Sequence, residues 1–194
     1  MKKIIYLFFT ILLLICLTGC DKNTDVTNAQ NTNENTDNWE IRYYMDQFNQ
    51  PTSKAYVVNK SIVSGAFSNT ATTDSELDAQ LIIEDGKVSI RLWEYGDMLV
   101  KSSYSKDYNI TMRRTDGTDC YLTGRISSGG DRINVVDKGE YFYNPNTIIE
   151  ELQKDGNVGF YITEEERLST KYLFIVETDN FADTYKSFLD LSTK

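Results

Sequence analysis

A two-residue alternation on both sides of one short turn is the feature that most restricts the fold of this chain. Between residues 77 and 83 every second side chain is apolar and most of the intervening ones are polar, and the alternation resumes between residues 88 and 92. Asp85-Gly86 separates the two runs, and this pair accepts the positive φ angles of a type I′ turn. Because side chains alternate between the two faces of a strand, the segment 77–92 predicts an antiparallel hairpin with one buried face.

Further turns and β-prone runs extend this pattern along the chain. A second hairpin is expected over 108–126 around Asp116-Gly117, and a turn at 127–130 leads into another strand at 133–136. The remaining predicted strands are 39–45, 55–58, 61–67, 158–163 and 172–177.

Two short helices are expected in the last third of the chain. Asn144-Pro145 is typical of an N-cap followed by the first helical residue, and Gly156 supplies a stop. A second helix is expected over 180–191. Its single apolar face consists of Phe181, Tyr185, Phe188 and Leu189. The predicted fold is mainly β (α+β), an antiparallel β-sandwich or partly closed barrel with two short helices near the C-terminus.

The first twenty residues have the composition of an export signal. Lys2 and Lys3 precede an almost unbroken apolar run over 4–17, and a basic head before a short apolar segment is typical of secretory signals. The run is shorter than the roughly 20 residues that a membrane-spanning helix needs. Residues 1–19 are therefore predicted to be a signal peptide.

The end of this segment, Leu17-Thr18-Gly19-Cys20, resembles the lipobox of bacterial lipoproteins. The resemblance implies that Cys20 is acylated, becomes the first residue of the mature protein and holds it at the extracytoplasmic face of the cell membrane. Residues 20–38 then form the lipidated cysteine and a disordered polar tether, because 21–38 contains almost no apolar side chains.

Residues 39–194 are predicted to form a single β-rich globular domain, since their number suits one domain with its own core. This region is similar to uncharacterised bacterial lipoproteins and secreted domains in the segments 65–73, 92–95 and 172–189. That resemblance implies no particular activity.

The charge and the residue types that are missing exclude several functions. The formal net charge is −9, and an acidic chain repels the phosphates of nucleic acids. The chain contains no histidine, which excludes a histidine base, metal ligand or pH switch.

The three cysteines leave no disulfide in the mature protein. Cys16 lies in the signal and Cys20 is assigned to the lipid, so Cys120 has no partner. We interpret Cys120 as a small buried hydrophobic residue rather than a reactive thiol, because free cysteines are among the most buried residues.

No motif in the chain assigns a catalytic residue, a metal or a cofactor. Glu164-Glu165-Glu166 is interpreted as a solvated turn rather than a cation site, because it lacks the glycine-bent spacing of calcium loops. The segment 127–131 is interpreted as a hairpin loop rather than an anion-binding nest, because it lacks the setting of a P-loop.

Two segments are candidates for binding. Trp93 and Tyr95 should point away from the face formed by Leu92 and its predecessors, as an aromatic platform if that side is open and as packing residues if it is covered. The hydroxyl-rich segment 67–75 is either a recognition loop or a polar connection whose side chains bond their own backbone.

The sequence therefore favours a membrane-anchored, non-enzymatic binding module of the cell envelope, with a protein, peptide or glycan as its partner and Trp93 and Tyr95 as a possible binding surface. One alternative is a carboxylate-based hydrolase of cell-wall or extracellular polymers, for which no acid pair can be nominated from the sequence. Another is a protein that blocks or sequesters an incoming factor at the membrane.

Overall fold

The computed structural model describes residues 37–137, 144–167 and 169–192. The signal, the lipobox with Cys20 and the tether up to residue 36 lie outside this part, so those predictions stay predictions. The described strands are β1 (Trp39–Met45), β2 (Pro51–Asn59), β3 (Val63–Ser68), β4 (Ser75–Glu84), β5 (Lys87–Glu94), β6 (Met98–Leu99), β7 (Lys106–Arg113), β8 (Asp119–Ile126), β9 (Ile133–Val136), β10 (Asn157–Glu164) and β11 (Lys171–Glu177). The described helices are α2 (Pro145–Leu152) and α3 (Phe181–Ser192).

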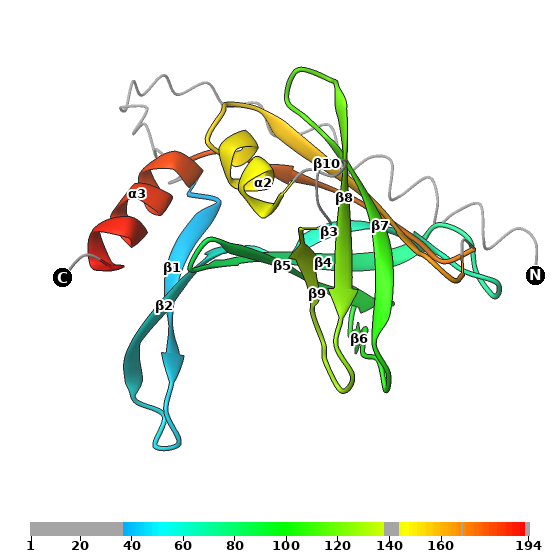
Figure 1. The fold of residues 1–194 in the computed structure, drawn as a ribbon, viewed down its shortest axis with the longest axis horizontal. Helices are drawn as coiled ribbons and strands as arrows, with labels where there is room; N and C mark the ends of the chain where they lie inside the picture. Colours follow the sequence, from blue (N-terminus) through cyan, green and yellow to red (C-terminus); the bar gives the residue numbers. More distant parts are fainter. Residues whose placement is uncertain (1–36, 138–143, 168, 193–194) are drawn as a thin grey trace, which may run out of the picture. The chain divides into compact units, whose positions relative to one another are not determined.

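Eight of these strands close into an antiparallel barrel (Figure 1). Their order around the barrel is β4-β3-β11-β10-β7-β8-β9-β5, and β5 pairs with β4 again. The prediction of a mainly β, antiparallel fold with two helices is confirmed. Of the two architectures expected, the barrel fits, and it is closed. Helix α3 lies near the C-terminus, whereas α2 is followed by two more strands.

The hairpin β4–β5 is the one that the alternation predicted, and it is shared between the barrel and its extensions. Asp85 and Gly86 have φ angles of 49° and 72°, as a type I′ turn requires. The first half of β4 pairs with β3 and its end pairs with β2. The start of β5 pairs with β9 and its end pairs with β6.

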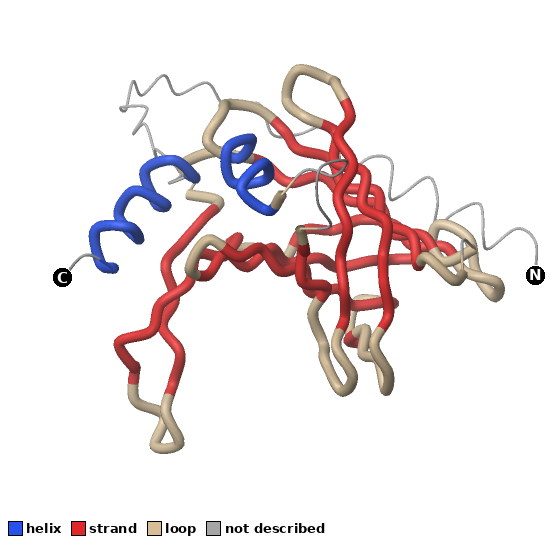
Figure 2. Tube along the Cα trace, viewed as in Figure 1, coloured by secondary structure: helices blue, strands red, loops and turns tan. Residues whose placement is uncertain are grey.

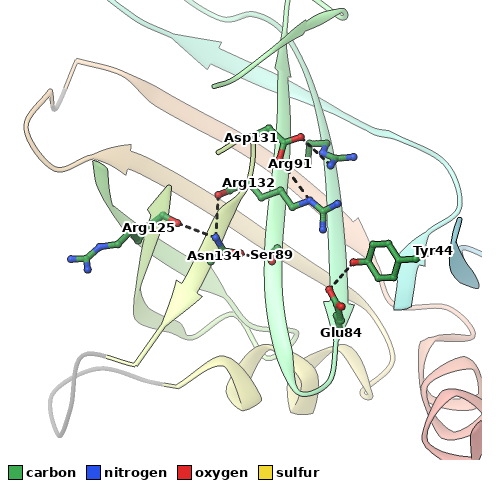
Figure 3. Close-up of polar contacts among 8 residues, drawn as sticks. All are labelled: Tyr44, Glu84, Ser89, Arg91, Arg125, Asp131, Arg132 and Asn134. Atoms are coloured by element: carbon green, nitrogen blue, oxygen red, sulfur yellow. Dashed lines mark hydrogen bonds and ion pairs between the residues drawn. The ribbon is translucent and has the colours of Figure 1, made fainter. Parts of the chain in front are cut away.

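The barrel closes where β9 meets β5, through two residue pairs that include Ser89 with Asn134. Side chains on the outer face reinforce this seam (Figure 3). Ser89 Oγ donates a hydrogen bond to Asn134 Oδ1 at 2.9 Å, and Arg91 Nη2 donates to Asp131 Oδ2 at 3.1 Å. The short main-chain ladder therefore has polar contacts beside it.

Apolar side chains fill the barrel at every second position of its strands. On β10, for example, Val158, Phe160 and Ile162 are buried, whereas Tyr161 between them is exposed. The rings of Phe160 and Phe174 on neighbouring strands stack with centroids 5.1 Å apart. An eight-stranded barrel is just wide enough for its own side chains to fill, and burial of apolar surface stabilises it by about 25 cal/mol per Å².

Helix α2 packs at one end of the barrel. Its apolar residues Ile148, Ile149 and Leu152 belong to the barrel core. Glu151 is also buried and accepts hydrogen bonds from the amide and the hydroxyl of Thr115, at 2.9 and 2.6 Å. Thr115 lies in the turn between β7 and β8, so α2 covers the end of the barrel at which β7 finishes.

The hairpin β1–β2 continues the sheet from the end of β4 and extends away from the barrel (Figure 2). Helix α3 packs against its base. The rings of Trp39 and Phe181 meet edge to face at 4.8 Å, and Asn180 bonds both the amide and the carbonyl of Trp39. Tyr44 donates a hydrogen bond of 2.6 Å to Glu84 and ties the hairpin to β4 (Figure 3).

Neither helix in the described part of the chain has the length and apolar character needed to cross a lipid bilayer.

Gly65 provides a test of the barrel's packing. A Cβ atom at this position would collide with the carbonyl oxygen of Leu173 and lie 2.8 Å from Phe174 Cβ, whereas one at Gly159 would meet nothing closer than 3.5 Å. We expect Gly65→Ala to lower the free energy of unfolding by about 1–3 kcal/mol. The matched control Gly159→Ala should leave it unchanged or raise it slightly. Urea unfolding of both variants measures this, and equal midpoints would contradict the close approach of β3 to β11.

Candidate functional site

Polar side chains gather inside the barrel at the end opposite α2. On four strands the inward-facing positions are apolar along most of the strand and polar at this end. These residues are Glu94 on β5, Lys106 and Tyr108 on β7, Glu164 on β10 and Tyr172 on β11. All five line one cavity.

The antiparallel order of the strands brings these residues together. Strands β7 and β11 begin at this end, whereas β5 and β10 finish there. Tyr108 is directly opposite Glu164 in the ladder, and Tyr172 is opposite Ile162, two residues before Glu164. The cavity is thus a product of strand direction and register, and we call it the barrel mouth.

The barrel mouth has a volume of about 770 Å³, which lies within the roughly 300–1,000 Å³ typical of small-molecule sites. Its rim is built from three connecting segments. Asn69, Thr70 and Ala71 come from the β3–β4 loop, residues 98–101 from β6 and the chain after it, and Glu166, Arg167, Ser169 and Thr170 from the β10–β11 connection.

Glu164 is the most deeply placed carboxylate of the barrel mouth, with 5% of the residue exposed. Lys106 Nζ lies 3.0 Å and Arg167 Nε 4.0 Å from its Oε1 atom. Neither contact has the geometry of a hydrogen bond, and Oε1 is buried with no hydrogen-bond partner in the described part of the chain. The two cations compensate the charge of this oxygen as ion pairs, and Glu164 lines the cavity through its other atoms.

The two tyrosines are buried beside these carboxylates. Tyr172 donates a hydrogen bond of 2.9 Å to Glu94. Burial raises the pKa of Tyr172 well above its usual value, and the neighbouring Glu94 raises it further. Burial likewise raises the pKa of Tyr108, with a smaller contribution from Glu164. Both phenols are therefore neutral donors over the physiological pH range.

The charges around the barrel mouth cancel. Three acidic residues, Glu94, Glu164 and Glu166, face three basic ones, Lys101, Lys106 and Arg167. Lys106 also lies 5.3 Å above the ring of Tyr104, an arrangement in which a cation is attracted to the face of an aromatic ring. The site therefore offers donors and acceptors in balance rather than one sign of charge.

The structure places the two predicted aromatic residues in different surroundings. Trp93 is half-buried on the outer side of β5, with the guanidinium of Arg91 lying 5.9 Å from its ring. Tyr95 follows the end of β5, has a φ angle of 54° and packs edge to face on Phe67 at 4.9 Å. Neither residue lines the barrel mouth, so the proposed aromatic pair is not part of this cavity.

The hydroxyl-rich segment has features of both interpretations. Asn69 Oδ1 accepts hydrogen bonds from the amides of Ala71 and Thr72, and Ser68 Oγ accepts one from the amide of Asp74. These local bonds hold the loop in shape. Its tip, residues 69–71, also forms part of the rim, which is where a recognition loop would lie.

The glutamate cluster divides between two environments. Glu165 and Glu166 are exposed, as predicted for a solvated turn, but for Glu164 that prediction is wrong. Glu164 is the last residue of β10, and its position in the alternation turns it into the barrel. Within the described ranges, no group of three or more acidic or cysteine side chains is arranged to hold a metal ion.

The other two candidates are consistent with structural roles. In the segment 127–131, the amide of Gly130 bonds Ser127 O and that of Gly129 bonds Ser102 O, so these donors are used within the protein. Cys120 is fully buried, and burial raises the pKa of its thiol, which confirms its interpretation as a buried hydrophobic residue.

A row of exposed apolar residues crosses the outer face of the barrel. Tyr121 on β8, Tyr161 on β10 and Leu173 on β11 are 59%, 40% and 51% exposed. Thr111 lies between the two tyrosines in the ladder and pairs with both, and Tyr161 pairs with Leu173. Sequence reasoning missed this row because it singled out aromatic residues close together along the chain.

Sequence reasoning also missed the barrel mouth. The signal that would have found it is the polar residue at the inward-facing end of each alternating run, for instance Glu94 after Leu92 and Glu164 after Ile162. Each such residue alone is ordinary, and only the strand order shows that they meet.

Comparisons of the chain with protein-family models, with curated proteins and with solved structures gave no match.

The raised pKa of Tyr172 predicts a loss of stability at alkaline pH. Above about pH 10 the unfolded chain releases tyrosine protons that the native state retains, so the free energy of unfolding falls as pH rises, by up to about 1.4 kcal/mol per pH unit for one tyrosine. Tyr172→Phe should make this fall less steep and cost about 1 kcal/mol at neutral pH through the lost hydrogen bond.

Unfolding curves from neutral pH to about pH 12 measure both effects. Tyr121→Phe controls for removal of a surface phenol. If the free energy of unfolding fell equally steeply with pH in the wild type and in Tyr172→Phe, the raised pKa of Tyr172 would be contradicted.

Proposed function

We propose that this protein is a binding protein of the cell envelope that takes a small polar ligand into the barrel mouth while lipid on Cys20 holds it at the extracytoplasmic face of the membrane. The observation that carries the proposal is a cavity of about 770 Å³ at one end of the closed barrel, into which four strands bring the polar residues Glu94, Lys106, Tyr108, Glu164 and Tyr172. A few convergent polar groups in a well-formed cavity are typical of a ligand site.

The framework around the site supports binding without large rearrangement. Glu94, Lys106, Tyr108, Glu164 and Tyr172 all belong to strands of the closed barrel. Side chains held on rigid strands lose little freedom when a ligand binds, so less of the interaction energy is spent on ordering them.

The hydrolase alternative has one observation in its favour, which is that Glu94 and Glu164 line the same cavity. A two-carboxylate hydrolase needs one carboxyl group that donates a proton to the leaving group. Here Glu94 accepts a hydrogen bond from Tyr172, and Glu164 lies 3.0 Å from an ammonium group. This arrangement favours the binding role over hydrolysis.

Ligand-observed NMR on the full chain in detergent micelles tests the binding site. The probes are a neutral sugar, a free amino acid and a dicarboxylic acid. We expect saturation transfer to at least one probe. Ala71→Trp on the rim should weaken it about tenfold or more because the indole fills the entrance. Ala182→Trp, the same change at an exposed position of α3, should have no effect. No transfer to any probe, or transfer insensitive to Ala71→Trp, would refute the proposal.

The lipid anchor has its own test. Metabolic labelling with palmitate should tag the wild-type protein, and Cys20→Ser should abolish the label because the thioether cannot form. Cys16→Ser, a matched change within the apolar run, should keep it. A label that survives in Cys20→Ser, or an unlabelled wild type, would remove the anchoring part of the proposal and leave the binding site untouched.

A further inference from the structure

We propose that the barrel mouth binds a neutral polyhydroxylated molecule, a saccharide, whose hydroxyl groups contact Glu164, Lys106 and Tyr172. This inference rests on the proposed function, since it names the class of ligand for the same site. Three observations carry it: the cancelling charges, the existing pairs between them, and the balance of donors and acceptors.

The charge balance argues against a ligand with a net charge. The barrel mouth is lined by three carboxylates and three cations. A charged ligand that loses its hydration needs an opposite charge that is not already compensated. Glu164 lies 3.0 Å from Lys106, and Glu94 accepts a hydrogen bond from Tyr172. A charged ligand would therefore compete with these contacts, whereas a neutral one can add to them.

A hydroxyl group matches the mixture of hydrogen-bonding groups that line the cavity. Carboxylates, which accept hydrogen bonds, lie there beside ammonium and guanidinium groups, which donate them. A sugar hydroxyl both donates and accepts, so a single group can donate to a carboxylate and accept from a neighbouring cation. Hydrogen bonds to charged groups contribute more than those between neutral groups, and adjacent hydroxyls on one ring repeat the arrangement.

The walls of the barrel mouth also supply an apolar surface. Tyr172 lines the cavity, and its ring is stacked with that of Phe67 at a centroid distance of 6.4 Å. Met98, Leu99 and Val100 add aliphatic surface. A pyranose has apolar C–H faces between its hydroxyls, so a lining that mixes rings with paired charges suits it better than it suits a purely polar ion.

A zwitterion, such as a free amino acid, is the nearest competing ligand. It would need one carboxylate and one cation that are both available, but Glu164 and Lys106 lie against each other. The observations therefore favour the saccharide, and the amino acid becomes an outcome of the test.

The test compares three molecules with the same ring and different charge: glucose, glucosamine and glucuronate. The full chain is held in a polyoxyethylene detergent, whose headgroup contains no sugar, at a slightly acidic pH where glucosamine is a cation and glucuronate an anion. Competition in saturation-transfer NMR ranks the affinities, with glycine as the zwitterionic probe. We expect glucose to bind at least about fivefold more tightly than either charged sugar and glycine to give no signal.

Two charge-removing variants sharpen the result. Glu164→Gln leaves Lys106 unpaired and should shift preference toward glucuronate, whereas Lys106→Gln should shift it toward glucosamine, each by about tenfold in the ratio of the two charged sugars. The double variant restores neutrality and should bring the ratio back. Melting curves identify any variant that fails to fold, and the wild-type series alone still decides the charge preference.

The outcomes separate this inference from the proposed function. Binding of glycine, or of a charged sugar as tightly as glucose, with sensitivity to Ala71→Trp would overturn the saccharide assignment and retain the site. Shifts of the same sign in Glu164→Gln and Lys106→Gln would also overturn it. Absence of binding by every probe would overturn both.

Discussion

The pairing of β9 with β5 is the constraint on which the rest of the structure depends. It consists of two residue pairs, and it joins Ser89 to Asn134 across 45 positions of the chain. Closing so long a segment costs conformational entropy, and the ladder alone is short. The hydrogen bond between the Ser89 and Asn134 side chains and the contact of Arg91 with Asp131 add to it from the outer face. Once this seam forms, the ring has no open edge between β9 and β5.

Ring closure also determines the site. Glu94 is at the end of β5 and Tyr108 near the start of β7, and the shorter way round the barrel between these two strands runs through β9 and β8. If β9 were detached, the wall between them would be missing. The seam thus links the stability of the fold to the geometry of the barrel mouth.

The part of this fold that depends on local physics could be predicted from the sequence. Alternation and β-prone runs indicated the described strands except β6 and the first half of β2. Asp85-Gly86 and Asp116-Gly117 marked two of the hairpin turns, and Asn144-Pro145 marked the start of α2. The pairing of strands that are far apart in the sequence could not be predicted from these local patterns. The contact of β3 with β11 and of β9 with β5 arises from packing of the whole chain, so neither closure nor the meeting of Glu94 with Glu164 could be derived from one-dimensional patterns.

The glutamate cluster illustrates the same limit at a single residue. Three consecutive glutamates have the composition of a solvated turn, and two of them lie in one. The third, Glu164, continues the inward-facing alternation of Val158, Phe160 and Ile162. A one-residue difference in where β10 ends decides whether this carboxylate faces water or the barrel interior. Composition therefore described the segment correctly and still missed the residue that matters most for the proposed chemistry.

Helix α2 gives the barrel a floor. Ile148, Ile149 and Leu152 are buried in the core and block this end of the barrel. A ligand that enters the barrel mouth must therefore leave through the same opening. The lifetime of a complex then depends on the contacts of the ligand with the rim as well as on those with the walls of the barrel mouth. Sequence changes confined to residues 69–71 of the rim would then alter the dissociation rate of the ligand without changing the groups proposed to recognise it.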